Sequence, residues 1–194
     1  MKTTRENIIR SYLTLGTEKG FDNVSLEDIA QNCGITKATI FSHFENYAAL
    51  KADALALCKT ALDNADFSVN FRTDYANLFT GLANSAIDTF SSYPLDCYFS
   101  LLDQKGMTDP AILHLRADLN SMFRARILVA LDYAVQRSWL ETDDTDSLST
   151  VLAACMYEGI RRELSAAHNH MDFPDIWDSF ISVIDCFRDS FRQP

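Results

Sequence analysis

The stretch that decides the fold is S25-LEDIAQNCGITKATIFSH-F44, residues 25–44. Its pattern predicts two short helices joined by a tight turn. Ser25 is a good N-cap for the first helix, and Asp28, three residues on, completes a near capping box. Gly34 suits the positive φ of a tight turn, and Thr36 caps the second helix. This is the pattern of a helix-turn-helix, although two packed helices of an ordinary bundle would look similar.

Helical periodicity continues on both sides of this stretch. Each further helix shows apolar residues three and four apart, and Gly or Pro residues mark several of the ends. The predicted helices occupy residues 4–20, 46–64, 74–90, 95–102, 111–137, from 146 or 147 to 167, and a last helix that opens at Pro174. Residues 66–72 are expected to be irregular, and residues 168–172 to form a polar turn.

Composition supports an all-α fold. The chain has 194 residues, of which 47% are hydrophobic, so it is able to bury a substantial core and is not disordered. Only 6 Gly and 4 Pro are present, which is too little turn chemistry for an all-β domain. We expect an N-terminal three-helix domain at residues 1–50, a linking helix at about 46–64, and a C-terminal helical bundle at 65–194.

The net charge of -10 argues against a nucleic-acid partner when it is taken for the whole chain. The charge is unevenly distributed, however. Residues 1–51 carry six basic and six acidic side chains, so the acidic excess belongs to the remainder. A helix N-terminus also attracts phosphate without Lys or Arg, so the neutral N-terminal region remains compatible with nucleic acid.

The five cysteines are scattered and show no CxxC spacing, which is typical of reduced thiols in an intracellular protein. The N-terminus has no apolar run behind it, and no apolar stretch approaches the ~20 residues of a membrane span. We therefore expect a cytoplasmic protein with no signal peptide and no membrane partner.

The flanks of the helix-turn-helix make the pattern more specific. The string TKATIFSHFENYAAL at residues 36–50, preceded by a helix ending in Gly20 and Phe21, resembles the DNA-binding domain of TetR-type (TetR/AcrR) one-component transcriptional regulators. The resemblance covers about residues 5–55 without gaps. The positions that match the family run are Thr39, Ile40, Phe41, Ser42, His43, Phe44 and Leu50.

The resemblance implies a homodimeric repressor of double-stranded DNA with a C-terminal domain for an unknown small-molecule effector. Induced release from the DNA is the commoner sense of regulation in the family. The chain departs from the family pattern at Phe41, where Tyr is frequent, and at Tyr47, where Lys is usual. Phe41 loses a phosphate contact, and Tyr47 can hydrogen-bond a phosphate but contributes no charge, so we expect a shallower salt dependence of DNA binding than is usual in the family.

Position within the motif assigns roles in DNA binding. Lys37 is expected to read guanine and Ala38 to touch a thymine methyl group. The expected DNA-binding residues are Ser25, Thr36, Lys37, Ala38, Thr39, Ser42, His43 and Tyr47, of which Ser25, Thr39, His43 and Tyr47 would contact phosphate. Lys2 and Arg5 would reach the DNA backbone or minor groove, and a half-buried surface histidine is the alternative for His43. The residues expected in the core are Ile29, Ala30, Ile40, Phe41 and Phe44.

The C-terminal part is rich in aromatic residues at helical spacing, most of which belong to a core. The resemblance implies that some line an effector pocket, for which we expect Tyr98, Leu102, Phe123 and Tyr157. One arginine among Arg116, Arg124, Arg126, Arg161 and Arg162 would meet a ligand carboxylate, unless these arginines are solvated or paired with acids. The last two helices are too apolar for a monomer surface, and the expected dimer interface is Val151, Cys155, Trp177, Phe180, Ile181 and Ile184.

Two other functions stay open. A metal-binding or enzymatic helical protein would use His168, His170 and Asp172, with Glu163 and His114. No HExxH, paired Glu-x-x-His or GxSxG pattern accompanies them, so we expect no catalytic residue, no metal site and no cofactor. A protein-interaction module is the other possibility, in which the acidic surface would suit a basic partner.

Overall fold

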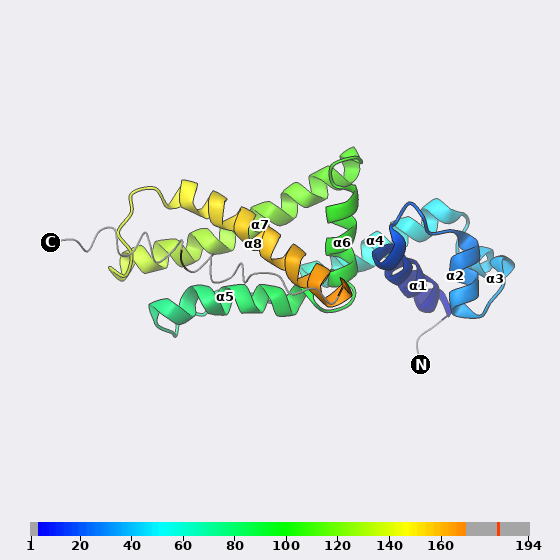
Figure 1. The fold of residues 1–194 in the computed structure, drawn as a ribbon, viewed down its shortest axis with the longest axis horizontal. Helices are drawn as coiled ribbons and strands as arrows, with labels where there is room; N and C mark the ends of the chain where they lie inside the picture. The colour runs from blue at the N-terminus through cyan, green and yellow to red at the C-terminus, as the bar shows by residue number, and fades with distance from the viewer. Residues whose placement is uncertain (1–3, 170–181, 183–194) are drawn as a thin grey trace. The chain divides into compact units, whose positions relative to one another are not determined.

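The computed structural model describes residues 4–169 and Ser182, and the regular secondary structure of this part of the chain is all α-helix, with no strand (Figure 1). The helices are α1 (Thr4–Lys19), α2 (Leu26–Cys33), α3 (Lys37–His43), α4 (Tyr47–Asp63), α5 (Tyr75–Phe90), α6 (Leu95–Lys105), α7 (Pro110–Gln136) and α8 (Thr145–Asn169). The predicted all-α class is confirmed. The predicted helix opening at Pro174 lies outside the described residues, and α8 continues two residues beyond its predicted end.

The chain forms two compact units that are not consecutive in sequence. The first unit takes the described residues up to Ala65 and adds Ser91–Leu113, and the second takes Asp66–Phe90 and the chain from His114. The expected domains were a single N-terminal and a single C-terminal segment. The difference arises because α6 packs against α1 and α4 within the first unit.

The first unit is organised around α1, which contacts α2, α3, α4 and α6. Ile8 and Leu13 of α1, Ile29 of α2 and Leu50 of α4 are completely buried, so one continuous apolar core holds these helices. Gly20 ends α1 with a φ of 92°, a conformation that a side chain disfavours.

The second unit has an aromatic core. Phe67, from the predicted irregular segment, makes edge-to-face contacts with Phe90 of α5 and Phe123 of α7, with ring centres 5.9 and 6.0 Å apart. The helix α5 also packs against α8. Within the part of the chain that the structure describes, no helix is both long enough and apolar enough to cross a membrane.

Candidate nucleic-acid interface

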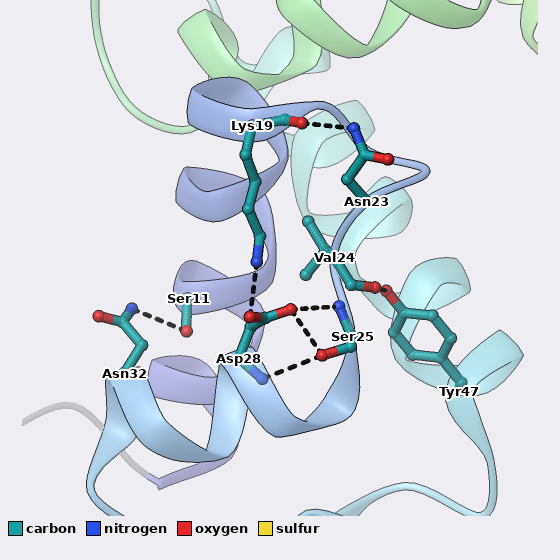
Figure 2. Close-up of polar contacts among 8 residues, drawn as sticks. All are labelled: Ser11, Lys19, Asn23, Val24, Ser25, Asp28, Asn32 and Tyr47. Atoms are coloured by element: carbon teal, nitrogen blue, oxygen red, sulfur yellow. Dashed lines mark hydrogen bonds and ion pairs between the residues drawn. The ribbon is translucent and has the colours of Figure 1, made fainter.

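The first helix of the motif, α2, begins with a complete capping box (Figure 2). The Asp28 amide donates to Ser25 Oγ at 3.2 Å, and the Ser25 amide donates to Asp28 Oδ2 at 2.8 Å. Both residues therefore satisfy amide groups that a helix start leaves without partners. The cap predicted from Ser25 and Asp28 is confirmed.

Asp28 also ties the end of α1 to the start of α2. Lys19 Nζ lies 2.7 Å from Asp28 Oδ1, and the Ser25 hydroxyl donates to Asp28 Oδ2 at 2.6 Å (Figure 2). The hydrogen bond from Lys19, followed by those from Ser25, holds the pKa of Asp28 well below its usual range. The carboxylate thus stays charged and fixes the entry to the motif.

The turn and the second helix have the geometry that the sequence predicts. Gly34 adopts a φ of 65°, and the Ile35 amide donates to the Ala30 carbonyl at 2.9 Å. Thr36 caps α3, because the Thr39 amide donates to Thr36 Oγ1 at 3.2 Å. The start of α3 is therefore fixed by local hydrogen bonds.

The helix α3 is held by one face and leaves the other in solvent. Ile40 and Phe44, four residues apart, are buried. Lys37 and Ser42 of the same helix are both exposed. Of the other expected contact residues, Thr36, Ala38 and His43 are exposed and Thr39 is half-buried. The half-buried alternative for His43 is therefore wrong.

The expectation that Phe41 belongs to the core is also wrong, because this side chain is 49% exposed. A helix turns by about 100° per residue, so Phe41 points well away from its buried neighbour Ile40. An exposed aromatic ring therefore lies on the outer face of α3, one turn beyond Lys37. Sequence reasoning missed this exposure, because a large aromatic residue in a short helix is ordinarily expected to be buried.

Lys37 is paired in the free protein. Its ammonium forms an ion pair with Glu27 of α2, and both side chains are well exposed. Such a pair contributes little stability and breaks readily. Glu27 is a second residue that sequence reasoning missed, because only the folded turn brings positions 27 and 37 together.

Two hydroxyl groups that were expected to contact phosphate are already used as donors. Tyr47 donates its phenolic proton to the Val24 carbonyl at 2.6 Å, and Ser25 donates to Asp28 (Figure 2). Burial, followed by the charge of Asp28, raises the pKa of Tyr47. A phosphate oxygen needs a donor, and neither group has another proton to give. These two residues therefore serve the internal structure of the motif.

Other polar side chains brace the same region. Asn32 Nδ2 donates to Ser11 Oγ at 2.8 Å, which joins α2 to α1 (Figure 2). Arg5 pairs with Asp53 of α4 and lies over the Phe44 ring at 5.0 Å, so in this structure it is held against α4. Lys2 lies outside the described residues.

The expected effector residues are all buried, but they divide between the two units. Tyr98 and Leu102 lie on α6 in the first unit, whereas Phe123 on α7 and Tyr157 on α8 belong to the second. Their role in binding an effector stays a prediction.

Three of the five candidate arginines are paired with acids, as the alternative reading held. Arg124 pairs with Asp146, while Arg161 and Arg162 share Glu158, whose pKa they lower to about 2. The other two stack on rings, with Arg116 over Tyr157 at 4.9 Å and Arg126 over Phe67 at 4.6 Å.

The remaining expected sites lie partly beyond the described residues. Val151 of α8 is 54% exposed, and Cys155, one turn on, is half-buried. The other expected interface residues, Trp177, Phe180, Ile181 and Ile184, fall outside the described range. So do His170 and Asp172 of the metal-binding alternative. Among residues that the structure places, no three His, Cys, Asp or Glu side chains are arranged to hold a metal ion.

A capped helix with an exposed face, here α3, that packs on two other helices, here α1 and α2, is typical of helix-turn-helix proteins. The family model of bacterial regulatory proteins, tetR family, matches residues 8–53. The biofilm operon negative transcriptional regulator IcaR of Staphylococcus aureus is 29% identical over 72 residues, 37% of this chain. That match spans only 39% of the length of IcaR. The transposon Tn10 TetC protein of Escherichia coli is 25% identical over 153 residues, 78% of this chain and 75% of TetC.

Solved structures show the same fold over the whole chain. A TetR-family transcriptional regulator from Marinobacter aquaeolei has a TM-score of 0.67 at 16% identity, covering 100% of this chain and 93% of its own. A transcriptional regulator from Saccharomonospora viridis, in complex with choline, has a TM-score of 0.65 at 19% identity, covering 96% of each chain. Residues 8–53 thus match the tetR family model, and the chain has the fold of these solved regulators.

Proposed function

We propose that this chain is a homodimeric transcriptional repressor that binds double-stranded DNA through α3 and is released by a small-molecule effector. The observation that carries the proposal is the division of α3 into an anchored face and an exposed face. Ile40 and Phe44 fix the helix, and the outer face presents Lys37, Phe41 and Ser42.

The outer face of α3 has the dimensions and chemistry of a major-groove reader. Seven helical residues span about 10 Å, and the major groove is about 12 Å wide. Lys37 is a donor suited to the guanine acceptors, while Ala38 and the exposed Phe41 ring suit thymine methyl groups. His43 and Thr39 remain candidates for phosphate contacts. We leave Ser25 and Tyr47 out of the contacts, because their protons are used inside the motif.

Lys37 must exchange one partner for another when it binds DNA. In the free protein its ammonium is paired with Glu27, and both groups are accessible to solvent. The exchange costs little, because an exposed ion pair is worth at most about 1 kcal/mol. Glu27 therefore lowers the affinity for DNA slightly while keeping Lys37 on the outer side of the turn.

The relatives support repression and control by a ligand. IcaR is a negative regulator, and the Saccharomonospora viridis protein was solved with choline. We infer that this chain is also a repressor under the control of a ligand, and that the effector stabilises a conformation that no longer fits the DNA. The chemistry of that effector is not carried over from either relative.

Fluorescence anisotropy with DNA from immediately upstream of the chain's own gene tests the proposal. We expect Lys37→Ala to weaken specific binding by about 10- to 100-fold, the cost of losing one base contact. Lys59→Ala is the matched control, because it removes an exposed lysine from α4, outside the motif, and should leave binding unchanged. Absence of binding even at low salt, or equal binding by the two variants, would contradict the proposal.

A further inference from the structure

A pocket of about 210 Å³ lies within the first unit, where α1, α4, α6 and the start of α7 meet. None of the four residues expected to bind the effector lines it. The pocket is therefore distinct from the effector residues expected from the sequence, and the chemistry of its walls decides what it binds.

The inner walls of the pocket are apolar. Leu13 and Phe21 come from α1 and the residues after it, Ala54 from α4 and Leu101 from α6, and all four side chains are buried. Tyr12 adds a second aromatic wall, with its ring centre 5.8 Å from that of Phe21 in an edge-to-face contact. Two rings and several aliphatic side chains form a surface suited to a flat apolar group.

Four charged residues also line the pocket, and three of them already have partners. Lys105 Nζ pairs with Asp22 Oδ2 at 2.6 Å. Asp109 Oδ1 accepts the Ala111 amide at 2.9 Å at the start of α7. The hydrogen bond and charge of Lys105, and then the more distant charge of Lys51, lower the pKa of Asp22, whose ion pair is with Lys105 alone.

Lys51 is the fourth charged residue, and it is not ion-paired with any described carboxylate. Its ammonium lies 4.6 Å from the centre of the Tyr47 ring, and no described acidic side chain forms an ion pair with it. Lys51 is exposed and lines the pocket, so it stands where the apolar interior meets water. The two lysines and two aspartates of the lining balance in formal charge, but the Lys51 ammonium is the one of these four groups that no ion pair or hydrogen bond engages in the described structure.

We infer that this pocket binds a small aromatic monocarboxylic acid, with the ring between Tyr12, Phe21 and Leu101 and the carboxylate on Lys51. A cavity of about 150 Å³ lined by apolar side chains accepts one benzene molecule. The larger volume here accommodates a ring with a short acid side chain. A cation is disfavoured, because both acids are engaged and Lys51 would repel it.

Isothermal titration calorimetry of the full chain tests this assignment, with 3-phenylpropionate as the probe. Its amide and 2-phenylethylamine serve as neutral and cationic probes of similar shape. We expect the acid to bind at least about tenfold more tightly than either, a gain typical of a charge-assisted contact. Failure of the acid to bind, or tighter binding of the amine, would overturn the inference.

Two variants locate the site. Lys51→Gln should weaken binding of the acid about tenfold while the amide is unaffected, and Lys59→Gln on the same helix should change neither. Ala52→Phe places a ring into the pocket from an exposed position and should abolish binding of the acid, with folding checked by circular dichroism. Unchanged binding of the acid in Lys51→Gln or in folded Ala52→Phe would place it elsewhere and overturn the inference. No DNA is present in these titrations, so their outcome is separate from that of the repressor proposal.

Discussion

Glu27 and Lys37 show how one residue contact adjusts the proposed DNA interface. Their ion pair spans the turn between α2 and α3 and involves the residue expected to read guanine. We predict that Glu27→Gln binds the upstream DNA about two- to fivefold more tightly, because it removes a competing carboxylate and a charge that repels phosphate. Anisotropy at fixed salt measures the change. Weaker binding by Glu27→Gln would mean that the carboxylate positions Lys37 productively.

Asp28 gives the first unit a defined pH dependence. Its folded-state pKa is lowered by Lys19 and Ser25, so it stabilises the fold above the ordinary carboxyl pKa. We predict that Asp28→Asn lowers Tm by a few degrees at pH 7. The difference from wild type should shrink as the pH falls below about 4 and continue to shrink as it passes through the lowered folded pKa.

Thermal unfolding followed by circular dichroism between pH 3 and pH 7 checks this prediction. Asp118→Asn, an exposed carboxyl on α7 outside the Lys19, Ser25 and Asp28 network, is the control. A Tm difference for Asp28→Asn that stays constant over the whole pH range would argue against the charged network.

A variant of Tyr47 distinguishes a structural role of its hydroxyl group from a role in contacting DNA. Its hydroxyl donates to the Val24 carbonyl, and Val24 is buried. Tyr47→Phe would leave this carbonyl without its donor, so we predict a loss of about 1–2 kcal/mol in unfolding free energy. We expect DNA affinity to change less than about twofold. Unchanged stability with a tenfold loss of DNA affinity would restore the phosphate contact expected from the sequence.

These residues also show the limits of local sequence information. The caps at Ser25, Thr36 and Asn46 could be predicted, because each partner lies three residues away. The partners of Tyr47 and Glu27 lie 23 and 10 positions away and depend on how the helices pack. The Tyr47 hydroxyl was therefore assigned to a phosphate contact, and the Glu27 carboxylate was missed.

Two helical glycines allow a matched test at the level of the elements. A methyl group at Gly16 of α1 would collide with the Phe21 ring, whereas one at Gly81 of α5 would meet no atom within 4 Å. We predict that Gly16→Ala destabilises the protein by about 1–3 kcal/mol through overpacking. Gly81→Ala should stabilise it by about 0.5–1 kcal/mol, the usual preference of a helix for Ala. Chemical denaturation measures the unfolding free energy of both variants. Equal changes in the two variants would show that the contact between α1 and Phe21 has room for a methyl group at position 16.

The positions of the helices in the sequence were easier to predict than their division between the two compact units. Apolar periodicity placed α1, α4, α5 and α7 within a residue or two, because burying a helix face imposes that period. The packing of α6 on α1 and α4 rests on distant contacts, such as the Phe21 amide donating to Gln104 Oε1 at 3.2 Å. No local sequence pattern predicts such a contact, so the grouping of α6 with α1 and α4 in one compact unit could not be inferred from the sequence.

For the whole molecule, the proposed repressor requires two copies of α3 on one duplex. Val151, exposed on α8, is compatible with the expected dimer surface, of which Trp177, Phe180, Ile181 and Ile184 lie outside the described residues. A two-fold dimer reads a pseudo-palindrome, with half-sites about one helical turn, or a multiple of it, apart. The spacing of protected DNA is therefore a direct consequence of the proposal.

Hydroxyl-radical footprinting of the full chain on the DNA upstream of its own gene measures that spacing. We predict two protected patches on one face of the duplex, related by an inverted repeat and separated by about 10 base pairs or a multiple of it. Both patches should disappear together in Lys37→Ala. A single protected patch, or no protection at a salt concentration where the protein is folded, would contradict the claim that this chain is a dimeric repressor reading DNA through α3.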